Sequence, residues 1–267
     1  MRYTQGSIHL SQSQDHALLK QVLRSEFVTQ SQLYEFMRLR HQERSRRSFD
    51  WRLRRLVNHG LVGRISVPSF QGERVYSIAP TGAAVLQGLG EYCLFAANRG
   101  ESKSEQVNVL HALELNDIHL SLLRKEPSAR WTYTTEIRSQ NQLTSFGYSK
   151  EYDAVITVQL AGQTVQLALE YERTPKAKKY YQDIVDVLTS EAQVGSFLYI
   201  MPNYDLLSYV SGIFAEAKLP VYFGLARDWH SQLLGMTVLD SSARSSVNLR
   251  DVLEGSVFTL RSEAFRS

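Results

Sequence analysis

The N-terminal third of the chain carries three short stretches in which apolar residues recur at helical spacing. They are residues 12–25, a segment that Thr29 caps with Gln32 three positions later, and a segment that Ser48 caps and Gly60 ends. The apolar positions are Leu18, Leu19, Val22 and Leu23 in the first, Leu33, Phe36 and Met37 in the second, and Trp51, Leu53, Leu56 and Val57 in the third. We predict three amphipathic helices with these positions buried.

Two β-like runs follow the third helix. They are LVGRISV (61–67) and RVYSIA (74–79), and PTGAAVLQGL (80–89) has the pattern of a closing helix. Three helices followed by a hairpin is the order of a winged helix-turn-helix domain, in which the third helix enters the major groove of DNA and the hairpin contacts the backbone. We predict a winged-helix DNA-binding domain over residues 1–97.

A polar segment, NRGESKSEQ at 98–106, separates this domain from a longer series of helix and strand patterns. One helix is expected over residues 104–125 and another from Pro175 to about Thr189. The remaining patterns predict strands over 131–139, 152–160, 164–172, 195–201 and 220–226, and a helix over 203–219. This order predicts an α/β domain with a mixed sheet over residues 98–267.

The two central strands of this domain are expected to form a hairpin through a turn at Ala-Gly-Gln. Side chains alternate between the faces of a strand, so Asp153 on the first strand can meet Glu170 and Glu172 on the second. Three carboxylates so close repel one another and raise each other's pKa. Mg²⁺ or Mn²⁺ would offset this repulsion by accepting oxygen ligands. The alternative is that the glutamates pair with Lys176, Lys178 or Lys179.

Charge is distributed unevenly along the chain. Residues 1–80 carry 13 Lys or Arg against 6 Asp or Glu, and the remainder carries 17 against 21. A basic segment joined to a mildly acidic remainder is typical of a nucleic-acid-binding module attached to another function. The arginines at or just before the third helix would contact phosphate and guanine, and they are Arg46, Arg47, Arg52, Arg54 and Arg55. The alternative is a winged helix used for protein contact or dimerisation.

The overall composition is that of a globular protein, with 43% apolar and 21% charged residues. The N-terminus has no apolar run of signal-peptide length, and no stretch approaches the length of a membrane span. Cys93 is the single cysteine, so an internal disulfide is impossible and a cysteine-based zinc site is excluded. We expect a cytoplasmic protein without membrane insertion.

An aspartate on one strand and Glu-x-Lys on the next resembles the pattern of the PD-(D/E)xK restriction-endonuclease-like nucleases. Here the pattern is YDAV (152–155) and Glu-Tyr-Glu (170–172), with a glutamate where those nucleases have lysine. The longer stretch LALEYERTPKAKKYY (167–181), together with LHALELND (110–117), resembles the MOBC relaxases, which are grouped with the replication-relaxation proteins. The resemblance covers the architecture of most of the chain.

The resemblance implies that the protein nicks one DNA strand at the transfer origin of a plasmid or integrative element. It assigns a divalent metal, Mg²⁺ or Mn²⁺, to Asp153, Glu170 and Glu172. Lys176 would replace the displaced lysine and stabilise phosphate charge. Tyr180, on the same helix face as Lys176, would orient the phosphate, stack on a base or attack as the nucleophile. The implied partners are double-stranded DNA and accessory relaxosome and coupling proteins.

Two functions from different classes remain open at this point. The first is a metal-dependent DNA-nicking relaxase. The second is a non-catalytic DNA-binding regulator or accessory transfer protein, in which Glu172 at the lysine position accompanies a loss of cleavage. The relaxase chemistry that uses a His-hydrophobe-His cluster is excluded, because the seven histidines contain no such triplet. Glu136, expected in a strand, is a further acidic candidate for the site.

Overall fold

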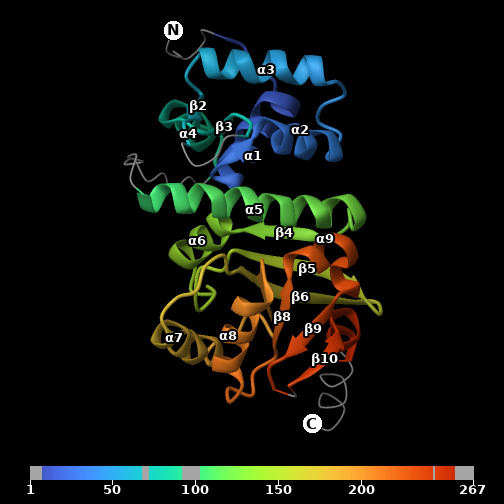
Figure 1. Ribbon diagram of the computed structural model, residues 1–267. Helices are drawn as coiled ribbons and strands as arrows, with labels where there is room; N and C mark the ends of the chain where they lie inside the picture. Colours follow the sequence, from blue (N-terminus) through green and yellow to red (C-terminus); the bar gives the residue numbers. More distant parts are fainter. Residues whose placement is uncertain (1–7, 68–71, 92–102, 243, 256–267) are drawn as a thin grey trace. The chain divides into compact units, whose positions relative to one another are not determined.

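The computed structural model describes residues 8–67, 72–91, 103–242 and 244–255 (Figure 1). The chain divides into two compact units, Met1–Leu120 and Ser121–Ser267. This division falls inside the long helix α5 (Lys103–Lys125). The boundary expected between residues 97 and 98 lies outside the described residues and stays a prediction. None of the described helices combines the length and the apolar character needed to cross a membrane.

The first unit contains a winged helix-turn-helix domain, as predicted. Its elements are the π-helical turn η1 (Gln12–His16), α1 (Ala17–Ser25), β1 (Val28–Thr29), α2 (Gln30–Leu39), α3 (Arg46–Asn58), β2 (Val62–Ile65), β3 (Val75–Ile78) and α4 (Pro80–Gly88). The three strands form an antiparallel sheet in the order β1-β3-β2. The pattern did not predict β1, because two residues are too few to show a period.

Local sequence determines where the helices of this domain begin and end. Thr29 Oγ1 accepts the N–H of Gln32 at 3.1 Å, and Gln32 Oε1 accepts the N–H of Thr29 at 3.2 Å, which completes the predicted capping box. Gly60, with φ of +71°, ends α3 as predicted. The predicted cap at Ser48 is wrong. Ser45 caps α3 instead, its Oγ accepting the N–H of Ser48 at 3.1 Å.

The core of the first unit is made by the apolar faces of its helices and by β3. The predicted inward positions of α1 and α2 are buried, and on α3 so are Phe49, Leu53 and Leu56. The other two predicted positions of α3 differ, because Val57 is only partly buried and the side chain of Trp51 is 56% exposed. Trp51 is two residues from both Phe49 and Leu53, so it lies on the opposite side of the helix.

The part of α5 that belongs to the first unit packs against the winged helix through the middle of α5. Gln32 Nε2 donates to the carbonyl oxygen of Leu113 and to Asp117 Oδ1, both at 2.8 Å. Asn116 Nδ2 donates to the carbonyl oxygen of Phe27 at 2.7 Å. These buried polar contacts tie α5 to the loop before β1 and to α2, so the winged-helix unit extends beyond its closing helix.

The second unit is built on a seven-stranded mixed sheet in the order β10-β9-β8-β7-β6-β5-β4. The strands are β4 (Arg130–Tyr133), β5 (Ala154–Leu160), β6 (Gln163–Tyr171), β7 (Phe197–Met201), β8 (Val221–Leu225), β9 (Thr237–Asp240) and β10 (Ser245–Asn248). The helices are α6 (Thr134–Leu143), α7 (Lys178–Thr189), α8 (Tyr204–Phe214), α9 (Ala226–Gln232) and the 3-10 turn η2 (Leu233–Gly235). The predicted α/β class with a mixed sheet is confirmed.

Three predicted elements of this unit differ from the structure. The helix expected over residues 203–219 ends at Phe214. The strand expected over residues 131–139 ends at Tyr133, and the chain continues as α6. Glu136 therefore lies on a helix, where its Oε2 accepts the N–H of Tyr133 at 3.1 Å and caps the first turn. The helix expected from Pro175 begins instead at Lys178, because Ala177 is still extended, with ψ of 145°.

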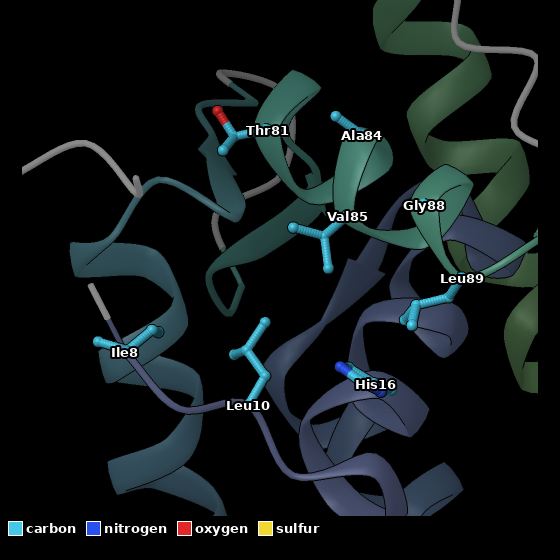
Figure 2. A pocket seen from close by; sticks show the side chains of 8 residues that line it. All are labelled: Ile8, Leu10, His16, Thr81, Ala84, Val85, Gly88 and Leu89. Carbon is cyan, nitrogen blue, oxygen red and sulfur yellow. The ribbon is translucent and has the colours of Figure 1, made fainter. Parts of the chain in front are cut away.

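A pocket of about 440 Å³ lies in the first unit between the segment before η1 and helix α4 (Figure 2). The residues that line it are Ile8, Leu10, His16, Thr81, Ala84, Val85, Gly88 and Leu89. Most of these side chains are apolar, and His16 is the one titratable group among them. The pocket contributes none of the carboxylates or arginines singled out by the sequence.

Candidate functional site

The hairpin of β5 and β6 positions the carboxylates. Ala161 and Gly162 connect the strands with φ of 48° and 75°, the two positive values that a tight type I′ turn requires. The register pairs Ala154 with Leu169, so the next position along the ladder brings Asp153 opposite Glu170. Directly opposed residues project from the same face of a sheet, so the two carboxylates are neighbours.

Glu170 is buried and is paired with a lysine that the sequence did not single out. Its side chain is 8% exposed, and its Oε1 lies 2.8 Å from Lys150 Nζ. Burial raises the pKa of Glu170 to about 7; Lys150 opposes this rise, whereas the carboxylates of Asp153 and Glu172 add to it. A carboxyl group with this pKa is partly protonated near neutral pH, even beside an ammonium group.

Glu172 is buried beside Glu170 and has both oxygens occupied. Oε1 lies 2.5 Å from Lys176 Nζ, and Oε2 accepts the hydroxyl of Tyr181 at 2.5 Å. Burial lowers the pKa of Lys176, but the contact with Glu172 outweighs it, so that the net shift is upward. Burial and the bond to Glu172 raise the pKa of Tyr181. Tyr181 is thus more than a packing residue, because it fixes one carboxylate oxygen.

Asp153 is held by the backbone around it. Its Oδ2 accepts the N–H of Tyr171 at 2.7 Å, and its own carbonyl oxygen accepts the hydroxyl of Thr134 at 2.7 Å. The first contact ties the carboxylate to β6, and the second ties the residue to the start of α6. Its orientation is therefore set by the sheet and not by a flexible loop.

Lys176 and Tyr180 lie at the exposed rim of this cluster. Lys176 Nζ is 3.4 Å from Tyr180 Oη and 4.5 Å from the centre of the Tyr180 ring. The hydroxyl of Tyr209 on α8 donates to the carbonyl oxygen of Lys176 at 3.2 Å. The Lys176 ammonium therefore links buried Glu172 to an exposed aromatic ring.

A buried tyrosine on β7 faces the same cluster. Tyr199 pairs with Glu170 across the parallel strands β6 and β7. Within the described parts of the chain, its hydroxyl has no hydrogen-bond partner. Burial raises its pKa well above the ordinary value, and Glu170 and Glu172 raise it further. An unsatisfied buried hydroxyl beside two carboxylates is costly, and such groups concentrate at functional sites.

The cluster contains the donor types that Mg²⁺ or Mn²⁺ prefers, but both oxygens of Glu172, Oδ2 of Asp153 and Oε1 of Glu170 are already engaged within the protein. Across the residues that the structure describes, no three His, Cys, Asp or Glu side chains are arranged to hold a metal ion. Lys150 and Lys176 supply the positive charge next to Glu170 and Glu172. A divalent cation would have to displace at least one of these ammonium groups before it could bind both glutamates.

The sequence pattern did not indicate three of these features, namely Lys150, the hydrogen bond donated by Tyr181, and Tyr199. Lys150 had a usable signal, since it stands three residues before Asp153 in the same segment. Tyr199 had none, because a tyrosine in an apolar strand is ordinarily a core residue. Its position beside Glu170 results from the pairing of β6 with β7.

The pKa of Glu170 predicts a pH-dependent stability in the absence of metal. The folded value of about 7 exceeds the ordinary value of 4.5, so the folded state holds this proton more tightly. The contribution of the Glu170 proton to the free energy of unfolding is fully present below pH about 4.5. It is lost as the pH rises through about 7. Relative to Glu170→Gln, the wild type should lose up to about 3 kcal/mol between pH 5 and pH 8. Urea unfolding of both proteins in chelator checks this, and parallel pH curves would contradict it.

Helix α3 presents its arginines in two directions. Arg46, Arg47 and Arg54 are exposed, although Arg46 Nε also contacts Asp50 Oδ1 at 3.1 Å. Arg55 is partly buried, with its Nη2 2.5 Å from Asp15 Oδ2. The exposed side chains of Arg46, Arg47 and Arg54 can reach DNA. The side chain of Arg55 is partly buried and can reach DNA only in part.

Arg52 is a correction to the expected DNA-contacting set, because its guanidinium is inside the domain. It contacts Asp15 Oδ1 at 3.1 Å, Glu43 Oε2 at 3.0 Å and Gln14 Oε1 at 2.6 Å. Its side chain is only 8% exposed. A buried arginine with two carboxylate partners cannot reach a phosphate without leaving both carboxylates buried and unpaired, which would strongly destabilise the fold.

Comparison with known proteins identifies a protein family. Residues 19–183 match the model of the replication-relaxation family. No curated protein matches the chain. A solved structure of the restriction endonuclease FokI bound to DNA is similar with 9% identity and a TM-score of 0.24. That alignment covers 81% of this chain and 43% of the FokI chain, so this chain spans less than half of the FokI chain. A similarity this distant carries no argument about function.

The family match extends from α1 of the winged helix to α7 of the second unit. It therefore includes α3, the β5–β6 hairpin with its three carboxylates, and the lysine-rich segment that follows. A match to this family indicates a role in DNA processing. Because the match covers more than half of its residues, this chain belongs to the replication-relaxation family.

Proposed function

We propose that this protein binds double-stranded DNA at the transfer origin of a plasmid or integrative element and nicks one strand there. The winged helix supplies the binding, and Asp153, Glu170 and Glu172 supply the cleavage site. The observation that carries this proposal is the burial of Glu170 and Glu172 next to Asp153. Burying like charges together is unfavourable, and such arrangements concentrate where charge is used in chemistry.

The proposed roles of the individual side chains follow from their contacts. A divalent cation, when bound, would polarise the scissile phosphate and lower the pKa of an attacking water. Asp153, Glu170 and Glu172 would hold it, with Asp153 oriented by the N–H of Tyr171 and Glu172 by the hydroxyl of Tyr181. Lys176, whose side chain is 42% exposed, would then turn from Glu172 toward the phosphate.

The test of this function is a nicking assay on supercoiled DNA that carries the cognate origin. With Mg²⁺ or Mn²⁺ we expect conversion to open circles that depends on the origin, and with chelator we expect none. Linear DNA with the cognate origin and linear DNA with a scrambled origin are assayed in parallel. This comparison separates sequence-specific nicking from the activity of a contaminating nuclease. Accessory proteins encoded beside the gene belong in a second reaction, because relaxosome partners are part of the proposal.

A second function, a non-catalytic DNA-binding regulator or accessory transfer protein, is favoured by a different observation. Glu170 and Glu172 are already neutralised by Lys150 and Lys176. A fold that keeps these ion pairs needs no metal. A calorimetric titration of the metal-free protein with Mn²⁺ measures metal binding and distinguishes the two functions. Tight DNA binding without Mn²⁺ binding or nicking, with partners present, would favour the regulator.

Arg47 and Arg54 should contribute directly to DNA affinity. Each exposed side chain that contacts a phosphate releases a counterion, so Arg47→Ala and Arg54→Ala should each weaken origin binding. The slope of log affinity against log salt should also decrease by about one unit for each lost contact. Fluorescence anisotropy between low and moderate salt measures both.

The matched control for these two variants is Arg227→Ala. Its side chain is 74% exposed and lies on α9 in the other unit. Its replacement should leave the affinity and the salt slope unchanged. If all three variants bind origin DNA like the wild type, the binding surface lies elsewhere.

Tyr180→Phe should leave nicking largely intact. We expect water to be the attacking group, so the Tyr180 hydroxyl is needed only for its 3.4 Å contact with Lys176 Nζ. Rates should therefore fall by no more than about tenfold. A protein–DNA adduct that survives denaturant in the wild type and is absent from Tyr180→Phe would instead identify tyrosine as the nucleophile.

A further inference from the structure

Two exposed tyrosines from different helices are held around one lysine. Tyr180 on α7 is 41% exposed and Tyr209 on α8 is 42% exposed. Both pack edge-to-face on buried Tyr181, with ring centres 5.6 Å and 6.2 Å away. Their hydroxyls meet Lys176, one at its ammonium and the other at its carbonyl oxygen. The rings are thus fixed in place while much of their surface remains open to solvent.

The surface around these rings is basic. Lys176, Lys178 and Lys179 are all exposed, and no acidic residue occurs in the sequence between Glu172 and Asp183. Lys178 and Lys179 open α7, where the helix dipole adds partial positive charge. Asp183 on α7 and Asp205 on α8 are the nearest exposed carboxylates in the sequence, so the positive charge is concentrated in residues 176–179, at the start of α7. We call Tyr180, Tyr209 and these three lysines the tyrosine–lysine face.

We propose that the tyrosine–lysine face binds an unpaired DNA strand, with bases stacked on Tyr180 and Tyr209 and phosphates near Lys178 and Lys179. Fixed aromatic rings interleaved with cations are the arrangement that binds single strands without reading their sequence. Paired bases in a duplex are stacked on each other and cannot meet a ring in this way. The lysines make the face complementary to a nucleic acid backbone rather than to an apolar protein surface.

The position of this face gives the proposal a consequence for cleavage, which rests on the proposed function. Lys176 is part of the face, where it contacts the ring of Tyr180, and its ammonium also lies 2.5 Å from the buried carboxylate of Glu172. A strand bound to the face would therefore be separated from the carboxylate cluster by one side chain, that of Lys176. The strand to be nicked would be presented unpaired, and the intact duplex would be held by the winged helix.

The test compares binding of a labelled single-stranded oligonucleotide with binding of the duplex of the same length, in chelator. Arg47→Ala and Arg54→Ala are combined in the background, so that contributions from the winged helix are reduced. In this background Tyr180→Ala and Tyr209→Ala should each weaken single-strand binding by roughly tenfold, the loss expected for one stacked base. Tyr180→Phe and Tyr209→Phe keep the ring and should bind normally.

The matched control is Tyr204→Ala, which removes a 68% exposed tyrosine from the start of α8. Tyr204 is five residues from Tyr209 and projects in a different direction, so it should not affect either DNA form. Lys178→Ala and Lys179→Ala should each reduce the salt slope for the single strand by about 0.7. These exposed lysines keep the test valid if an alanine at Tyr209 disturbs folding.

Three results would overturn the proposal. They are a wild type that does not bind the single strand, alanine variants that bind it normally, and losses of equal size on single strand and duplex. A second protein held by this face instead would give normal DNA binding in every tyrosine variant. No metal or cleavage enters this assay, so a protein that fails to nick still gives a readable result. Nicking without single-strand binding would refute this inference alone.

Discussion

Replacing Glu170 with glutamine is expected to lower the rate of origin-dependent nicking by more than about 10²-fold while leaving DNA affinity nearly unchanged. The substitution keeps the size of the side chain but removes the charge that would hold a divalent cation. Glu170 is buried, so it does not contribute to the surface that first meets DNA. A slight gain in affinity is consistent with this reasoning, since a negative charge near phosphate is removed.

Single-turnover nicking at saturating Mg²⁺ or Mn²⁺ measures this effect, with anisotropy reporting DNA affinity. Asp186→Asn is the matched control, because it neutralises an exposed carboxylate on α7. Glu172→Gln should behave like Glu170→Gln if it is also a ligand. Its effect should be mild if Glu172 only pairs with Lys176 and Tyr181.

Lys176→Ala separates these cases further. Loss of a contact to the phosphate in the transition state should lower the rate by about 10²-fold at saturating metal. Loss of the ion pair alone should instead cost about 1–3 kcal/mol of stability, because Glu172 stays buried with only Tyr181 as its partner, and should leave the rate intact. If Glu170→Gln nicks DNA at the wild-type rate, the carboxylate cluster takes no part in the mechanism.

Replacing Arg52 with alanine is expected to destabilise the winged helix by about 3–5 kcal/mol. The substitution leaves the carboxylates of Asp15 and Glu43 buried without the guanidinium that joins them. Arg55 remains beside Asp15, with Nη2 2.5 Å from Oδ2, so Glu43 should bear most of the loss. Arg52→Lys should recover only part of the stability, because one ammonium cannot reproduce the three contacts of the planar fork.

Arg54→Ala on the same helix is the control for this prediction. Its side chain is exposed, so it should change the free energy of unfolding by no more than about 0.5 kcal/mol while reducing DNA affinity. Urea unfolding of both variants measures the contrast. A loss below about 1 kcal/mol for Arg52→Ala would mean that Asp15 and Glu43 find other partners or water.

The sequence by itself determined the features that depend on neighbouring residues. Helical spacing predicted the three helices of the winged helix, and the Thr29–Gln32 capping box and Gly60 set two of their ends. Alternation and the turn at Ala-Gly-Gln predicted the β5–β6 hairpin, although Gln163 already belongs to β6. These features could be derived because capping bonds, turn dihedrals and apolar periods are satisfied within a few residues of chain.

Only the tertiary structure decided which of several similar side chains are buried and what they pair with. Arg52 and Arg54 have the same chemistry and are two residues apart, yet the first is internal, because its side of α3 faces Asp15 and Glu43. Lys150 and Tyr199 reach Glu170 only because β5 and β7 flank β6. The strand expected beyond Tyr133 became α6, because β4 pairs with β5 over only four residues. Partner choice depends on which distant segments the fold brings together, and no local pattern contains that information.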